Sequence, residues 1–210
     1  MKLRYKAVGL NEIIKDLGKK EKQAGKALKA TVNDMRRRVP GKVADEVRGR
    51  YNIKKAEIMP NTEKNKDAKK PKGKKAGRTI VKGETIDAMT FIYAGRPLSP
   101  THFGMRPTEP KLGANGRWVQ VSATVIKGRR RKWGRFIFLA KTGTKDKNKI
   151  PYITFTRKHR KPYKREPIVV KKTVSLPQMV SNKHVRPNID KQINELLEKR
   201  LANNVKRFLE

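Results

Sequence analysis

The sequence contains no cysteine, few acidic residues and no long hydrophobic run. Without cysteine the chain has no disulfide, thiolate metal site or cysteine nucleophile, which suits a reducing cytosol. The first residues do not form a signal-peptide pattern, because Lys2, Arg4 and Lys6 interrupt any apolar run. No apolar stretch approaches the roughly 20 residues that span a bilayer. We therefore expect a soluble protein, or part of a soluble assembly, that does not contact a membrane.

The scarcity of acidic residues leaves a large positive charge. The 210 residues include 55 Lys and Arg against 18 Asp and Glu, for a formal charge of +37. Such a chain repels itself, so we expect it to work beside an acidic partner. Nucleic acid is the first candidate, an anionic protein surface the second and a membrane surface the third. The hydrophobic fraction of 35% allows one modest core if the apolar residues cluster. We predict a single domain over residues 1–210.

Apolar residues recur at helical spacing near both ends of the chain. Residues 10–17 and 24–35 predict N-terminal helices, and the apolar stripe resumes over 43–51. Between these stretches Pro40-Gly41 is expected to bend or break the helix. A longer pattern over 187–209 predicts a C-terminal helix of about six turns with one apolar face.

Between the helical regions the spacing changes to two, which is typical of strands. Predicted strands cover residues 1–8, 79–81, 88–94, 118–126, 136–140 and 152–156. The resulting fold class is α+β, with an antiparallel sheet packed against the N-terminal helices and a long C-terminal helix.

Residues 61–78 are dense in lysine and nearly free of large apolar side chains. Such a segment cannot bury enough surface to order itself, so we predict a flexible basic arm or loop. A solvated tether and a nucleic-acid contact are equally good interpretations of the arm. Its candidate contact residues are Lys69, Lys70, Lys72, Lys74 and Lys75.

Two further basic loops follow predicted strands. Lys127–Gly134 joins the strand over 118–126 to the apolar run over 136–139, which predicts a hairpin with a basic tip. The second loop covers Arg157–Pro162. Lys and Arg bind phosphate whatever the base sequence, and Trp133 either stacks on an unpaired base or anchors the hairpin to the core. The candidate residues for contact with nucleic acid or an acidic partner are Arg129, Arg130, Arg131, Lys132, Arg157, Lys158 and Arg160.

The sequence carries no motif typical of an enzyme. It has no Gly-x-x-x-x-Gly-Lys loop, no dinucleotide fingerprint and no nucleophile elbow. His102, His159 and His184 lack metal-ligand spacing, so we expect loop or surface positions for them. We predict a protein that is not an enzyme and holds no cofactor or metal.

Residues 95–104 form a stiff stretch whose pattern of prolines and glycines does not follow from the basic composition of the chain. Two prolines fix their own φ angles and two glycines permit turns, which predicts a structured loop over 95–104. The residues that define this loop are Gly95, Arg96, Pro97, Leu98, Ser99, Phe103 and Gly104.

Four landmarks stand in a fixed order along the chain. They are Arg50-Tyr51-Asn52-Ile53, then Gly95–Ser99 with Phe103-Gly104, then Val121–Gly128 with Gly134–Ile137, and finally Ser175–Met179 before a charged helix. In this order the chain resembles the phage minor tail protein Z family, the tail completion proteins of long-tailed bacteriophages.

The resemblance implies assembly rather than catalysis. Members of that family are structural virion proteins that act late in tail assembly, near the head-proximal end of the tail. It implies a homo-oligomeric ring, a hexamer by analogy with tail symmetry, that meets the tail terminator and head-tail connector proteins. The expected location is the neck region of the virion, and the host cytoplasm during assembly. The lysine arm over 61–78 carries more positive charge than the family requires, which suggests specialisation for DNA or for an acidic neighbour.

Two other interpretations fit the charge. A ribosomal or other RNA-packing protein explains the lysine arm and the lack of catalytic motifs equally well, but it does not explain the ordered landmarks. A DNA-condensing protein, in which charge alone is functional, would tolerate scrambled basic segments.

Overall fold

The structure, a computed structural model, describes residues 1–4, 21–59, 76–86, 88–134, 136–142, 151–157 and 168–209. The α+β class expected from the sequence is confirmed, since two long helices accompany small antiparallel sheets. The elements in chain order are β1 (Lys2–Arg4), α2 (Glu21–Arg50), α3 (Lys55–Ile58), β2 (Arg78–Lys82), β3 (Thr90–Ala94), η1 (Pro100–Phe103), β4 (Ser122–Ile126), β5 (Arg129–Lys132), β6 (Ile137–Lys141), β7 (Tyr152–Arg157), β8 (Ile168–Val170), α4 (Leu176–Val180) and α5 (Arg186–Leu209).

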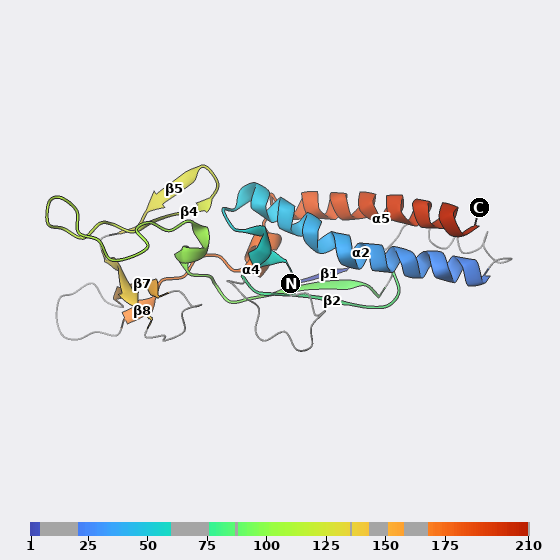
Figure 1. Cartoon of the computed structure of the whole chain (residues 1–210), viewed down its shortest axis with the longest axis horizontal. Helices are drawn as coiled ribbons and strands as arrows, with labels where there is room; N and C mark the ends of the chain where they lie inside the picture. Colours follow the sequence, from blue (N-terminus) through green and yellow to red (C-terminus); the bar gives the residue numbers. More distant parts are fainter. Residues whose placement is uncertain are drawn as a thin grey trace.

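The helices α2 and α5 lie antiparallel along one half of an elongated molecule (Figure 1). Their apolar residues face each other because they repeat every three or four positions. The buried residues of the two faces are Ala27, Met35, Val39, Val43 and Val47 on α2 and Ile189, Ile193, Leu197 and Leu201 on α5. Near the end of this contact the Asn204 amide donates a 3.0 Å hydrogen bond to Thr31 Oγ1. The buried polar pair is therefore satisfied, as a buried amide requires.

A three-stranded sheet packs on this helix pair. Its order is β1-β3-β2, and β3 pairs antiparallel with both neighbours. Leu3, Phe91 and Tyr93 are fully buried against the helices and belong to the same core. The core therefore joins the first strand of the chain to its last helix.

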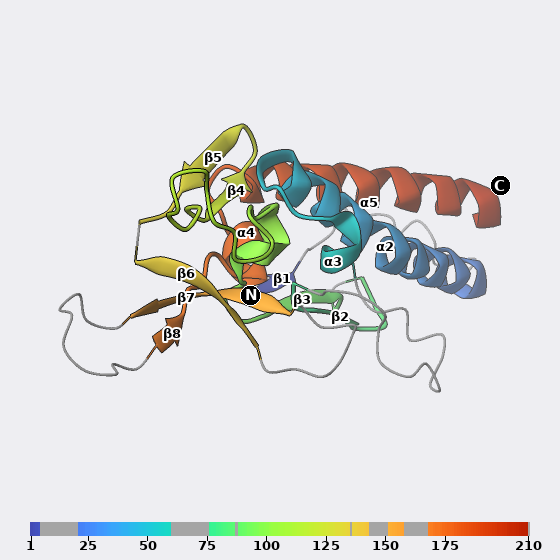
Figure 2. The same ribbon diagram turned by 60° about the vertical axis from the view of Figure 1, so that its left-hand side comes forward.

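Two further sheets lie at the end of the molecule away from the C-terminus (Figure 2). One consists of β4 and β5, and the other has the order β6-β7-β8. The sequence predicts one antiparallel sheet, whereas the described residues form three. The main core reaches this end through Val125 and Ile126 of β4, and a small separate cluster forms around Met105, Val121 and Ala123.

The predicted break at Pro40-Gly41 is wrong. The helix α2 continues through Pro40 for ten more residues. Proline removes one hydrogen bond from a helix, but its fixed φ remains helical. Val39 and Val43 on either side of it are almost fully buried, so burial of one continuous apolar stripe outweighs the lost bond.

The remaining predicted elements are largely present. Strands β2, β3 and β7 and helix α5 match their predicted ranges to within two residues, and β8 was not predicted. The predicted strand over 1–8 corresponds to β1, with residues 5–8 outside the described part. The predicted helix over 10–17 also lies outside it. The predicted arm over 61–78 ends too late, because Ala76 is buried in the core and Arg78 begins β2.

Candidate nucleic-acid interface

The loop over Gly95–Gly104 follows β3 and includes η1, and both its backbone and its side chains hold it in place. Leu98 N–H donates to the Val174 carbonyl at 3.2 Å, and Thr173 N–H donates to the Leu98 carbonyl at 2.7 Å. Leu98 and Phe103 are buried in the core. Gly104 then ends η1 with φ +62° and ψ +45°, a left-handed conformation that favours glycine. Arg96, Pro97 and Ser99 lie on the same loop, and the Arg96 side chain is exposed.

A buried hydrogen bond between His102 and Glu57 braces this loop. His102 Nδ1 lies 2.5 Å from Glu57 Oε2, and both side chains are largely buried. The sequence predicts His102 at a loop or surface position; it lies on the loop, with its side chain turned inward. Glu57 was not singled out, because 45 positions separate the two residues and no spacing rule connects them.

The basic hairpin differs from its prediction. Its turn is only Lys127-Gly128, with φ +74° at Gly128, and the following basic residues form β5 rather than a loop tip. The strand β4 covers Ser122–Ile126 and not 118–126. The apolar run over 136–140 pairs with β7 and not with β4. A Lys-Gly pair suits a two-residue hairpin turn. This pair begins the stretch Lys127–Gly134, so the arginines after it continue as a strand instead of extending the loop.

Alternation along β5 separates its basic side chains. Arg130 Nη1 donates to Ser122 Oγ and its Nη2 donates to the Gly104 carbonyl, each at 3.2 Å. Arg130 therefore ties the hairpin to the Gly95–Gly104 loop. Arg129 and Arg131 point to the other side of the strand, because successive side chains in a strand alternate.

On that other side lies a groove of about 1090 Å³, called here the basic groove. It runs between β5, the start of β6, the end of β7 and the segment that leads to α4. Its cationic lining residues are Arg129, Arg131, Lys132, Arg157, Lys171 and Lys172. No Asp or Glu is among the residues that line it in the described part of the chain. The groove is thus a concentrated positive surface without a carboxylate to neutralise it.

The structure brings together some of the predicted contact residues and not others. Arg129, Arg131, Lys132 and Arg157 share the basic groove, whereas Arg130 is occupied in the hydrogen bonds above. Lys171 and Lys172 were missed, because a two-lysine step after β8 carries little signal in a chain with 55 basic residues. The other predicted contact residues, Lys69, Lys70, Lys72, Lys74, Lys75, Lys158 and Arg160, lie outside the described residues.

Trp133 anchors the hairpin, as one of its two interpretations predicts, and also lines the groove, whereas stacking on a base stays a prediction. Its side chain is half-buried and packs against the small cluster of Met105, Val121 and Ala123. Its backbone N–H also donates to the Val121 carbonyl at 2.9 Å. At the same time Trp133 lines the basic groove, beside the exposed Phe136. The groove therefore offers aromatic surface next to its cations.

The chemistry of this arrangement is electrostatic. Within the described ranges, no group of three or more His, Asp or Glu side chains is placed to hold a metal ion. None of the helices in the described part is both long enough and apolar enough to cross a membrane. Guanidinium and ammonium groups around an open groove bind phosphate oxygens by charge-assisted hydrogen bonds.

No protein-family model, no curated protein and no solved structure matches this chain. The resemblance to phage tail proteins therefore rests on the ordered landmarks in the sequence. One of these now has a structural explanation. Ser175 caps α4 in a reciprocal capping box with Gln178, and Leu176 and Met179 fill the core.

Proposed function

We propose that this chain is a structural assembly protein that holds a nucleic-acid backbone in its basic groove. The observation that carries the proposal is the convergence of six cationic side chains from three segments, with no carboxylate in the described lining. Phosphates are the anions that such a groove neutralises best, because each contact also releases a condensed counterion. Contacts to the backbone supply affinity and no base readout, so binding is independent of sequence.

The setting we propose is the head-proximal end of a long phage tail. The ordered landmarks that resemble tail completion proteins support this setting, as does an elongated body with a formal charge of +37. Within it the chain would form a ring with further copies of itself and meet the tail terminator and head-tail connector proteins. Self-repulsion in such a ring is tolerable when DNA or acidic neighbours supply the opposite charge.

The groove is tested by the salt dependence of DNA binding. The double variant Arg129→Ala/Arg131→Ala should reduce the slope of log K against log salt by about 1.8 on a 30-base-pair duplex, since each phosphate contact contributes roughly 0.9. The matched control is Lys22→Ala/Lys26→Ala, which removes the same charge from exposed positions on α2. Equal slope changes in the two variants would contradict a defined groove and favour a protein in which charge alone is functional.

The setting is tested by sedimentation of a nuclease-treated lysate from producing cells, followed by detection of this chain with an antibody. Migration with tails or complete virions is the expected result and would justify imaging the neck. Migration with ribosomes would overturn the proposed setting in favour of an RNA-packing protein. The two experiments are independent, because a groove that binds duplex DNA says nothing about where the protein is located.

A further inference from the structure

A second surface lies beside the basic groove and has a different character. The chain between η1 and β4 folds back on itself as a small hairpin, called here the 106–122 loop. Arg106 and Ser122 close its base through two backbone hydrogen bonds of 2.8 and 2.7 Å. Farther out, Val119 N–H donates to the Lys111 carbonyl at 2.8 Å. The loop is therefore held in one conformation by its own backbone.

This loop exposes large apolar side chains. Trp118 is 69% exposed and Leu112, its bridge partner across the loop, is 53% exposed. Val119 beside them is also exposed. Among the described residues this loop holds three of the six large hydrophobic side chains that are exposed. An exposed aromatic on an ordered loop is the kind of residue that anchors protein interfaces.

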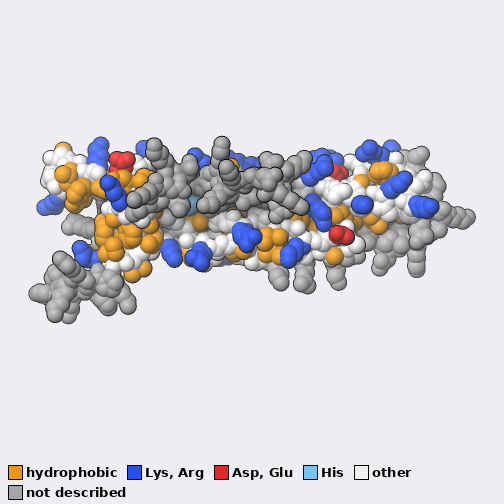
Figure 3. All heavy atoms as spheres, turned by 60° about the horizontal axis from the view of Figure 1, so that its bottom comes forward, with side chains coloured by type: hydrophobic (Ala, Val, Ile, Leu, Met, Phe, Trp, Pro, Cys, Tyr) orange, Lys and Arg blue, Asp and Glu red, His pale blue; other side chains and the backbone are white. Residues whose placement is uncertain are grey.

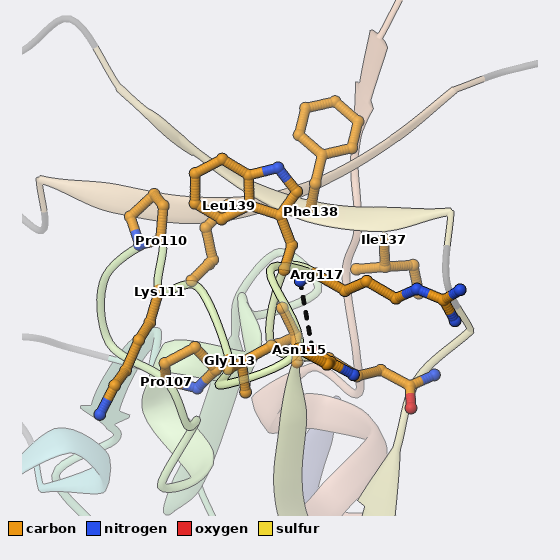
Figure 4. Close-up of a pocket in the computed structure, with 13 residues that line it drawn as sticks. Pro107, Pro110, Lys111, Gly113, Asn115, Arg117, Ile137, Phe138 and Leu139 are labelled. Carbon is orange, nitrogen blue, oxygen red and sulfur yellow. Dashed lines mark hydrogen bonds between the residues drawn. The ribbon is translucent and has the colours of Figure 1, made fainter.

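Trp118 and Val119 also line a pocket. A space of about 1020 Å³ separates the 106–122 loop from β6, and Ile137, Phe138 and Leu139 line its far side. Figure 4 shows the loop and the β6 side chains across this pocket, with Lys111 and Arg117 on two sides of it. Hydrophobic side chains also gather on the surface at this end of the molecule (Figure 3). Apolar side chains of Trp118, Val119 and β6 line the pocket together with polar Asn115 and Gln120, and Lys111 and Arg117 give it positive charge.

The charge at the rim decides which partner fits. Lys111 and Arg117 are the only charged residues that line the pocket in the described part of the chain. A second copy of this chain would bring a net charge of +37 against them. A partner with carboxylates next to its apolar side chains would gain attraction at the rim while burying Trp118 and Val119.

We propose that the 106–122 loop and β6 together dock an acidic segment of another protein, whose aromatic or aliphatic side chains enter the pocket. This surface is distinct from the basic groove, although Ile137 borders both. The proposal does not depend on nucleic-acid binding. It assigns the two spaces that meet at Ile137 to different partners, nucleic acid in the basic groove and protein in the pocket.

The test uses Trp118 as its own reporter. The chain has two tryptophans, so the full-length Trp133→Phe variant leaves Trp118 as the only indole. Two 12-residue peptides of equal negative charge serve as probes, one with Phe and Leu between its glutamates and one with Ser in their place. The apolar peptide should bind at least tenfold more tightly, a difference of about 1.4 kcal/mol, and should shift Trp118 emission to the blue.

Matched substitutions locate the binding. Val119→Ser in the same background should weaken the apolar peptide at least tenfold, whereas Val169→Ser, a similarly exposed valine on β8, should leave its affinity unchanged. Both sites are exposed, so equal urea midpoints would verify that the variants fold. Equal binding of the two peptides, or equal effects of the two substitutions, would overturn the proposal. A blue shift that grows with protein concentration without peptide, together with dimers in sedimentation equilibrium, would replace the acidic partner with a second copy.

The two proposals can fail separately. Arg129→Ala/Arg131→Ala should lower duplex binding and leave the preference for the apolar peptide intact. Loss of that preference in this double variant would contradict the separation of the two surfaces.

Discussion

Replacing Gly104 by valine tests whether the Gly95–Gly104 loop depends on a left-handed backbone turn. Gly104 ends η1 with φ +62°, directly after the fully buried Phe103. Its carbonyl also accepts a hydrogen bond from Arg130. A change in this turn would therefore disturb both the core and the attachment of the β4-β5 hairpin.

The expected loss of stability depends on two local effects, the strain of the left-handed backbone and the contacts of the added side chain. A residue with a Cβ atom in the left-handed region costs roughly 1–2 kcal/mol, and a β-branched one costs up to about 3 kcal/mol. The nearest atom to an added Cβ is Asn52 Nδ2 at 3.0 Å, the far end of a side chain that can move. Backbone strain therefore dominates, and Gly104→Ala should destabilise by about 1–2 kcal/mol and Gly104→Val by about 3 kcal/mol.

The assay is urea unfolding followed by far-ultraviolet circular dichroism. Gly41→Ala is the control, because Gly41 lies inside α2 and no atom lies within 4 Å of an added Cβ. That substitution should stabilise the protein by about 0.5–1 kcal/mol, so the same chemical change acts in opposite directions at the two glycines. An unchanged slope of free energy against urea would show that the comparison reports the native state. A Gly104→Val protein as stable as the parent would refute the reasoning.

Three further predictions concern stability. Burial raises the pKa of Tyr93 above its ordinary 10.0, so the unfolded chain releases this proton first and the free energy of unfolding falls as the pH rises past about 10. Urea midpoints at about pH 8 and pH 11 should therefore differ less in Tyr93→Phe than in the parent. An equal difference in the two proteins would contradict this role of Tyr93. Leu197→Asp places a carboxylate in the core and should cost more than about 4 kcal/mol, whereas Asn194→Asp on the exposed face should be nearly neutral by thermal melting. Arg130→Ala should lower the urea midpoint and Arg129→Ala should not, because only Arg130 bonds to Ser122 Oγ and the Gly104 carbonyl; equal midpoints would contradict this role.

Periodicity in the sequence predicts much of the fold because it records which side chains are buried. The apolar spacing over 187–209 predicts α5 nearly to its ends, and alternation predicts β2, β3 and β7. Pro40 shows the limit of local rules, since the tertiary burial of Val39 and Val43 keeps α2 whole. The hairpin shows another limit, because four consecutive basic residues look like a loop although they pair as β5.

The candidate site was predicted in part. Clusters of charge mark Arg129, Arg131 and Arg157 in the sequence, but nothing there indicates that the two segments share one groove. Lys171 and Lys172 join them only because β7 pairs with β8 and the chain then turns toward α4. The Glu57–His102 pair has the same origin, since it links residues that only the packed core brings together.

The sequence by itself determined the α+β class, the long C-terminal helix, the large positive charge and the absence of cysteine chemistry, because composition and periodicity are local properties of the chain. Only the tertiary structure decided that Arg130 is a structural brace while its neighbours face a groove, and that Trp118 stands exposed beside the pocket under the 106–122 loop. The physical reason is that local patterns specify which faces are apolar. Which faces and charges then meet depends on strand pairing and packing between residues far apart in the chain.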